Sequence, residues 1–167
     1  HIYKKSANLL SGLRAVKQKE EVDLIQTACN ITKKGVERVF NKLRPGIYEY
    51  ELGAEILHEF LINKASGFAY EPIIASGKNA CVLHYCANNE QCKDGDLVLM
   101  DFGAEYGNYA SDLTRCFPVS GRFSKRQRAV YNSVLKVMKG AKSLLKPGVF
   151  LQEYEKAVGA LMEKELV

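Results

Sequence analysis

Residues 97–115 read LVLMDFGAEYGNYASDLTR, two β-rich runs separated by a glycine-containing turn. Alternating apolar residues in both runs predict two antiparallel strands joined as a hairpin. If the hairpin turns about Tyr106 and Gly107, Asp101 lies directly opposite Asp112 on the neighbouring strand. Residues paired in this way lie about 4.5–5.5 Å apart. The sequence therefore predicts two carboxylates that face each other across the hairpin.

This pair of carboxylates needs a compensating charge. Strand alternation puts Asp101 on the face of Leu97 and Leu99, so we expect both carboxylates to point toward an apolar side. Facing like charges are destabilising, and a buried unpaired carboxylate costs several kcal/mol more. Two divalent metal ions would compensate them, with Mn, Mg or Ca favoured by hard oxygen ligands and Zn or Co open where a histidine joins. Two alternatives stay open: a register shift that exposes an aspartate to solvent, or neutralisation by Arg115 and nearby lysines.

The composition is that of an ordinary globular domain. Of the 167 residues, 47% are hydrophobic and 26% are charged, close to average values. No run approaches the ~18 consecutive apolar residues of a membrane span, so we expect no membrane partner. The 24 basic residues outnumber the 19 acidic ones but are scattered along the chain, so we expect no nucleic-acid partner. Five cysteines without a C-x-x-C pair argue against a disulfide scaffold and favour a cytoplasmic localisation.

Two amphipathic helix pairs flank the β-rich middle of the chain. Apolar residues at three- and four-residue spacing predict the helices, and a capping box at Ser124 and Gln127 opens the third of them. The predicted helices cover residues 17–43, 49–64, 124–145 and 151 onward, and the predicted strands cover residues 72–75, 81–86, 97–102 and 109–119. The fold class is therefore α+β: a helix pair, an antiparallel sheet and a second helix pair.

A short repeat supports this organisation. Residues 43–47 read LRPGI and residues 145–149 read LKPGV, each between a long helix and a shorter one. A repeated unit of two helices and a sheet would make the second copy end before its sheet begins. The alternative, that a basic residue followed by Pro-Gly is simply a common helix stop, stays open.

His84 lies in the predicted strand 81–86, which reads CVLHYC. There its side chain would alternate with those of Val82 and Cys86. A single histidine in such a strand is either a hydrogen-bonded core residue or a functional one, and the residues alone leave both interpretations open.

Three segments carry a family resemblance. Residues 83–85 (LHY), 95–106 (GDLVLMDFGAEY) and 109–119 (YASDLTRCFPV) resemble the Xaa-Pro aminopeptidases (aminopeptidase P), members of the pita-bread metallopeptidases. The resemblance implies an incomplete pita-bread fold and a dinuclear site of two divalent metal ions, commonly manganese. It makes Asp101 a ligand of one metal and Asp112 a ligand that bridges both. It also places His84 in the substrate site as a catalytic residue, and it implies no other cofactor.

The same resemblance implies a function and a domain organisation. The expected enzyme is a metalloaminopeptidase that removes the N-terminal residue from peptides with proline in second position, by attack of a metal-bound hydroxide. A prolidase and a non-catalytic pita-bread binding module are the alternatives. Residues 1–16 would be a linker from a missing N-terminal domain, and residues 17–167 the N-terminal part of the catalytic domain.

The resemblance also implies that this chain is a truncated piece. In the family the second sheet supplies a metal-ligating histidine and two glutamates, and we find no residues here to assign to them. We therefore expect the metal site to be incomplete and the fragment to be inactive. The full-length protein is expected to bind peptides with N-terminal Xaa-Pro and to form a homo-oligomer.

Overall fold

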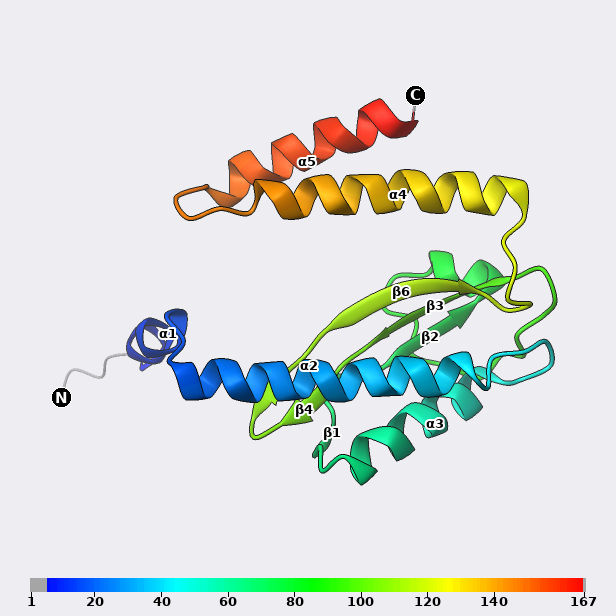
Figure 1. The fold of residues 1–167 in the computed structure, drawn as a ribbon, viewed down its shortest axis with the longest axis horizontal. Coiled ribbons are helices and arrows are strands. Elements are labelled where there is room, and N and C mark those ends of the chain that lie inside the picture. The colour runs from blue at the N-terminus through cyan, green and yellow to red at the C-terminus, as the bar shows by residue number, and fades with distance from the viewer. Residues whose placement is uncertain (1–5, 167) are drawn as a thin grey trace. The chain divides into compact units, whose positions relative to one another are not determined.

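The computed structural model describes residues 6–166, and the chain divides into two compact units, residues 1–121 and 122–167. In the first unit, the helices α2 (Lys19–Phe40) and α3 (Glu49–Ile62) pack side by side against the strands (Figure 1). Both helices were predicted, and their ends differ from the prediction by a few residues. A further helix, α1 (Ala7–Ala15), lies within the segment expected to be a linker and was not predicted.

The strands form two small antiparallel sheets instead of the single predicted one. The first sheet has the order β1 (Gly67–Phe68), β4 (Ala104–Tyr106), β5 (Tyr109–Ala110). The second has the order β2 (Ile73–Ser76), β3 (Leu97–Phe102), β6 (Leu113–Pro118). The 3-10 helix η1 (Gly77–Cys81) follows β2. The hairpin is therefore divided between the two sheets. Its turn-proximal strands β4 and β5 belong to the first sheet, and β3 and β6 belong to the second.

The core of the first unit lies between α2, α3 and one face of β3. Val98, Met100 and Phe102 alternate along β3 and are buried, as the two-residue period of a strand requires. They belong to one cluster with buried side chains of the helices, among them Leu52 and Phe60. Full burial of an apolar side chain of this size contributes about 1.5–3 kcal/mol. This packing fixes the orientation of β3 and hence which of its side chains face away from the helices.

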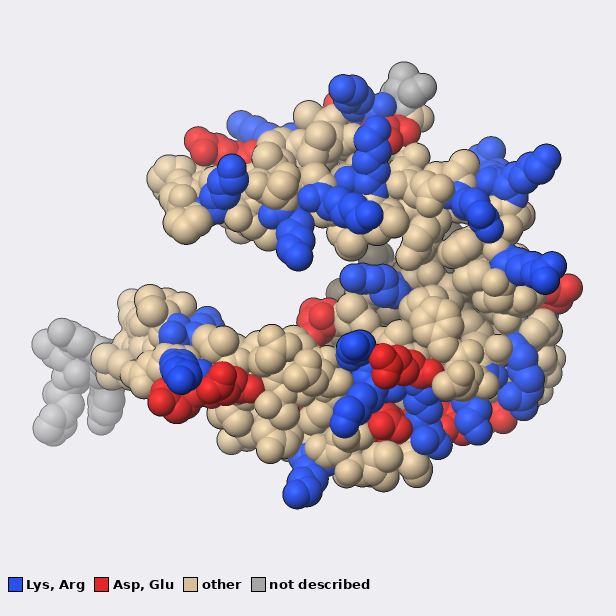
Figure 2. All heavy atoms as spheres, in the orientation of Figure 1, with Lys and Arg blue, Asp and Glu red and all other residues tan. Residues whose placement is uncertain are grey.

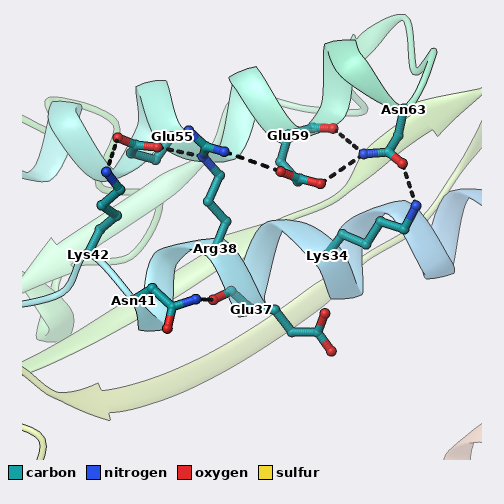
Figure 3. Close-up of polar contacts among 8 residues, drawn as sticks. All are labelled: Lys34, Glu37, Arg38, Asn41, Lys42, Glu55, Glu59 and Asn63. Carbon is teal, nitrogen blue, oxygen red and sulfur yellow. Dashed lines mark hydrogen bonds and ion pairs between the residues drawn. The ribbon is translucent and has the colours of Figure 1, made fainter.

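An ionic ladder joins α2 to α3 on the outer side of the helix pair (Figure 3). Arg38 of α2 donates to the carboxylate of Glu55 at 2.5 Å and lies 3.5 Å from Glu59, both on α3. Lys42 lies 3.4 Å from the second oxygen of Glu55. The Arg38 and glutamate side chains are partly buried, so water screens these charges less than it screens exposed ones.

Replacing Arg38 tests the contribution of this ladder. We expect Arg38→Met to lower the Tm, because it leaves Glu55 and Glu59 as two neighbouring carboxylates without their shared cation. Lys33→Met is the matched control, since the 3.7 Å pair of Lys33 with Glu37 is largely exposed and such pairs contribute little. Thermal denaturation compares the two; an equal Tm for both variants would contradict the prediction.

The same ladder predicts a dependence of stability on pH. The hydrogen bond from Arg38 is the largest of the effects that hold the pKa of Glu55 below its usual value of 4.5. A carboxyl group whose pKa is lowered on folding stabilises the protein above its unfolded pKa, and this contribution is lost as the pH falls through the folded value. We therefore expect the Tm difference between wild type and Arg38→Met to shrink below pH 4.5, which Tm measurements against pH can check.

The second unit is a helix pair, α4 (Lys125–Leu144) and α5 (Leu151–Leu166). The predicted capping box is confirmed: Gln127 N donates to Ser124 Oγ at 3.2 Å, and Ser124 N donates to Gln127 Oε1 at 2.8 Å. Figure 2 shows the basic side chains spread over both units on the visible face, with acidic ones among them. None of the helices in residues 6–166 is long and apolar enough to cross a membrane.

Candidate metal centre

The hairpin turns one position later than predicted. Tyr106 pairs with Tyr109, so Gly107 and Asn108 are the two turn residues. Both have positive φ, +59° and +65°, as the central residues of a type I′ turn require, and Gly and Asn are the residues that tolerate it best. The predicted turn about Tyr106 and Gly107 is therefore wrong.

The corrected turn changes the partner of Asp101. In the observed register Asp101 pairs with Thr114 and not with Asp112. Asp112 lies before β6, in the short connection that follows β5, and its side chain is exposed, whereas Asp101 is half-buried. The prediction that the two aspartates occupy directly opposite strand positions is wrong.

The two carboxylates nevertheless converge on one hydroxyl group. Tyr70, in the connection between β1 and β2, donates from its hydroxyl to Asp101 Oδ1 at 2.7 Å, and the same oxygen lies 3.1 Å from Asp112 Oδ1. The two carboxylate oxygens are thus no further apart than the sum of these distances. A phenol has one proton and donates to one carboxylate at a time, so one negative charge is always left without this donor.

The environment of the carboxylates is less apolar than expected. Asp101 shares its face with Leu97 and Leu99, which are half-buried, while the buried core residues of β3 lie on the opposite face. Asp101 therefore lies on the predicted face, with Leu97 and Leu99, but this face is half-buried and the core lies on the other face of β3. Arg115 does not neutralise the pair: its guanidinium donates to the carbonyl of Thr114 at 2.7 Å. Within residues 6–166, no Lys, Arg or His forms an ion pair with either aspartate.

The donor set fits a hard divalent cation in part. Two carboxylates that approach one point offer the anionic oxygen ligands preferred by Mn, Mg and Ca. In the part of the chain that the structure describes, no group of three or more His, Cys, Asp or Glu side chains is placed so that it could hold a metal ion. Asp101 and Asp112 are therefore a partial ligand set.

A buried polar cluster holds the backbone next to Asp112. The hydroxyls of Thr32 on α2 and Ser111 lie 2.6 Å apart, and the amide of Ala104 donates to Thr32 Oγ1 at 2.9 Å. An ideal Cβ on Gly103 would lie 1.7 Å from the carbonyl oxygen of Ser111. This close backbone approach is possible only with glycine, and it fixes where Asp112 leaves the hairpin. Sequence reasoning missed Thr32 and Ser111, which carry no spacing signal.

Tyr70 was also missed, because its position depends on a connection without regular structure. Burial is the main cause that raises the pKa of the Tyr70 phenol far above its ordinary value, and the hydrogen bond to Asp101 adds to it. The phenol therefore remains a protonated donor throughout the physiological range. A donor of this kind orients a ligating carboxylate.

Removing the Tyr70 hydroxyl should weaken metal binding. Loss of a group that orients a ligand typically costs about 10–100-fold in metal affinity, and we expect Tyr70→Phe to reduce the affinity of the protein for divalent cations by about tenfold. Tyr109→Phe is the matched control, since its hydroxyl bonds Glu21 at 2.5 Å and touches neither aspartate. Calorimetric titration measures both, and unchanged affinity in Tyr70→Phe would refute this role.

His84 does not lie in a strand, and the predicted strand 81–86 is wrong. After η1 the chain enters an irregular segment in which His84 adopts a positive φ of +53°. This conformation is uncommon for a residue other than glycine and is incompatible with the expected alternation. The side chain is exposed, and within residues 6–166 its imidazole forms no hydrogen bond. No hydrogen bond or ion pair of the described residues joins it to either aspartate.

Comparisons with known proteins show what the chain is similar to. Residues 23–167 match the model of metallopeptidase family M24. The Xaa-Pro aminopeptidase of Haemophilus influenzae is 43% identical over 159 residues, 95% of this chain and 37% of that protein. The Xaa-Pro dipeptidase of Pyrococcus furiosus is 35% identical over 153 residues, 92% of this chain and 44% of that protein. The structure of proline aminopeptidase P II from Yersinia pestis superposes with a TM-score of 0.93 at 41% identity, covering 97% of this chain and 37% of that one. The chain thus spans less than half the length of each of these relatives.

Proposed function

This chain belongs to metallopeptidase family M24, and we propose that the complete product of its gene is a metalloaminopeptidase that removes the N-terminal residue from peptides with proline in second position. The α+β pita-bread fold expected from the sequence is confirmed by the superposition on an aminopeptidase P over 97% of the chain. The observation that carries the proposal is the convergence of Asp101 and Asp112 on the Tyr70 hydroxyl.

The residues of this chain would divide the work at the site. Asp101 and Asp112 would hold the metal ions. Tyr70 would orient the two carboxylates through its hydroxyl. Bound divalent ions would supply Lewis-acid polarisation and activation of a water molecule. His84 is exposed, and its imidazole forms no hydrogen bond within residues 6–166; it would donate a hydrogen bond to the oxyanion that develops on the scissile carbonyl.

Three finer points belong to the same proposal. We assign manganese as the metal, because the ligands on this chain are hard carboxylate oxygens. A cytoplasmic setting is supported by five free cysteines, four of which are at least partly accessible and would be prone to oxidation elsewhere. We also propose a homo-oligomer for the complete product. Its peptide substrates would be recognised by a free N-terminus followed by proline.

A set of test peptides distinguishes the proposed function from two other candidate functions. Similarity to the dipeptidase of Pyrococcus furiosus favours a prolidase as the second candidate, and a non-catalytic peptide-binding module is the third. The test measures hydrolysis by the manganese-loaded complete product of Xaa-Pro-Yaa, Xaa-Pro, Xaa-Ala-Yaa and an N-acetylated Xaa-Pro-Yaa. Cleavage of the first alone or with longer peptides supports the proposal. Cleavage of the dipeptide alone indicates a prolidase, and no cleavage of any indicates a binding module.

The chain of residues 1–167 by itself should bind manganese weakly and cleave none of these peptides. Only two carboxylate ligands converge in its described part, and each missing ligand leaves coordination to water. Calorimetric titration of this chain beside the complete product checks the expectation. Tight manganese binding together with Xaa-Pro cleavage by the chain alone would refute it.

A further inference from the structure

Glu49, the first residue of α3, is a buried carboxylate outside the candidate metal centre. Its side chain is 0% exposed, and within residues 6–166 no Lys, Arg or His pairs with it. Burying an unpaired carboxylate costs several kcal/mol unless hydrogen bonds satisfy it. It accepts four such bonds, from Ser76 N (2.7 Å), Ser76 Oγ (2.8 Å), the Tyr85 hydroxyl (2.9 Å) and Glu90 N (3.0 Å).

The four donors divide between the two oxygens of Glu49. Oε1 accepts both bonds from Ser76, at the end of β2. Oε2 accepts the bonds from Tyr85 and Glu90, which lie in the irregular segment after η1. A carboxylate is an acceptor at both oxygens, so Glu49 can tie the sheet and this segment to the start of α3. The positive end of the helix dipole favours a negative charge there.

The irregular segment that Glu49 binds through Tyr85 and Glu90 contains His84. Tyr85 is its direct neighbour in sequence, and His84 itself holds a positive φ of +53°. Such a conformation persists only when surrounding contacts impose it. On the far side, Asn88 accepts from Ile74 N at 2.7 Å and donates to Pro72 O at 2.7 Å. The hydrogen bond of Tyr85 to Glu49 is thus the anchor adjacent to the histidine.

We propose that Glu49 is a positioning residue for His84: by binding Tyr85 and Glu90 N it fixes the segment that presents the imidazole to the substrate. This inference rests on the proposed function, since it assigns His84 its role in the substrate site. Burial, followed by the hydrogen bond to Glu49, raises the pKa of the Tyr85 phenol above its ordinary 10.0, so the phenol stays a donor at physiological pH.

The test uses Glu49→Gln in the manganese-loaded complete gene product. The amide keeps the size of the side chain but turns one acceptor into a donor, which must face either Glu90 N or Ser76 N. We expect kcat for an Xaa-Pro-Yaa peptide to fall about tenfold, the effect of one buried donor left unsatisfied, with KM and manganese content nearly unchanged. Glu51→Gln is the matched control: it lies in the same helical turn, is exposed, and accepts from Tyr48 N at 2.8 Å.

A double-mutant cycle separates positioning from plain stabilisation. If Glu49 acts through His84, Glu49→Gln has no further effect on kcat in a His84→Ala background. Equal losses of kcat in both backgrounds would overturn the proposal, as would a lowered Tm with unchanged kcat. Tyr85→Phe, which removes one donor and leaves Ser76 bonded, is a milder second variant. Its loss of about threefold should likewise vanish in the His84→Ala background.

Hydrogen exchange gives a readout that does not depend on turnover. In Glu49→Gln, peptides covering residues 82–91 should exchange at least about tenfold faster than in wild type, because an anchored segment loses protection when its anchor is weakened. Glu51→Gln should leave the rate unchanged. Unchanged exchange in Glu49→Gln would contradict the anchoring itself. If the wild-type protein were inactive but Glu49→Gln still exchanged faster, the proposed function would be contradicted. The anchoring of residues 82–91 by Glu49 would still be supported.

Discussion

Asp112→Asn should lower kcat/KM of the complete gene product for an Xaa-Pro-Yaa peptide by a factor of about 10³ or more. The amide has the shape of the carboxylate but no charge, so it holds a cation beside Asp101 much more weakly. The ions that the two aspartates are proposed to hold contribute several kcal/mol of transition-state stabilisation, and each 1.36 kcal/mol lost is about tenfold in rate. Steady-state kinetics in saturating manganese measures the change.

Glu105→Gln is the control for this substitution. Glu105 lies on β4 of the same hairpin and is half-buried, and within residues 6–166 its side chain forms no hydrogen bond or ion pair with either aspartate. The same loss of charge there should leave kcat/KM within about twofold, because it breaks no side-chain hydrogen bond or ion pair of the described residues. If Asp112→Asn kept wild-type kinetics, or if Glu105→Gln were equally damaging, the assignment of Asp112 to the metal centre would fail.

Gly103→Ala should lower the free energy of unfolding by at least about 3 kcal/mol. The added Cβ would lie 1.7 Å from the carbonyl oxygen of Ser111 and 2.5 Å from its carbon. Both are backbone atoms, held by the cluster of Ser111 with Thr32, so they cannot move aside without separating the hairpin from α2. Thermal denaturation of the complete gene product should show a large fall in Tm.

Gly159→Ala is the matched control, and it should leave the free energy of unfolding unchanged or raise it slightly. Gly159 lies within α5, and an added Cβ meets nothing within 4 Å. Alanine is favoured over glycine in a helix interior by up to about 1 kcal/mol, so this variant should be equally stable or slightly more so. A tolerated Gly103→Ala would show that the hairpin does not need the close approach to Ser111.

Most of the helices could be predicted because their signals are local. The apolar period of α2 and α3 and the capping box at Ser124 are written in consecutive residues, and the structure has helices at these positions. The face of β3 that packs against the helices could not be predicted, for a different reason. Both faces carry apolar residues, and only the packing of Phe60 and its neighbours on α2 and α3 decides which face becomes the core.

The hairpin shows how a small error in a turn propagates. The sequence offers Gly107 as the turn residue, but only the positive φ of both Gly107 and Asn108 fixes the turn between them. Moving the turn by one residue shifted the partner of Asp101 by two positions, from Asp112 to Thr114. Proximity of the carboxylates was predicted, and the structure realises it through Tyr70.

The irregular segment around His84 lay beyond local reasoning. Its apolar and aromatic residues are typical of a strand, but its hydrogen bonds join it to distant parts of the chain. Tyr85 bonds Glu49, and Asn88 bonds Pro72 and Ile74. From the sequence alone, Glu49 cannot be told from an ordinary exposed glutamate in the first turn of a helix. Only the folded chain shows that both of its oxygens are used.

The most direct measurement is the number of manganese ions bound by the complete gene product, by calorimetric titration with metal analysis. If Asp101 binds one ion and Asp112 bridges both, wild type should bind two ions, Asp101→Asn should keep one tightly bound, and Asp112→Asn should keep neither. Two tightly bound ions in Asp112→Asn, at wild-type affinity, would contradict the account.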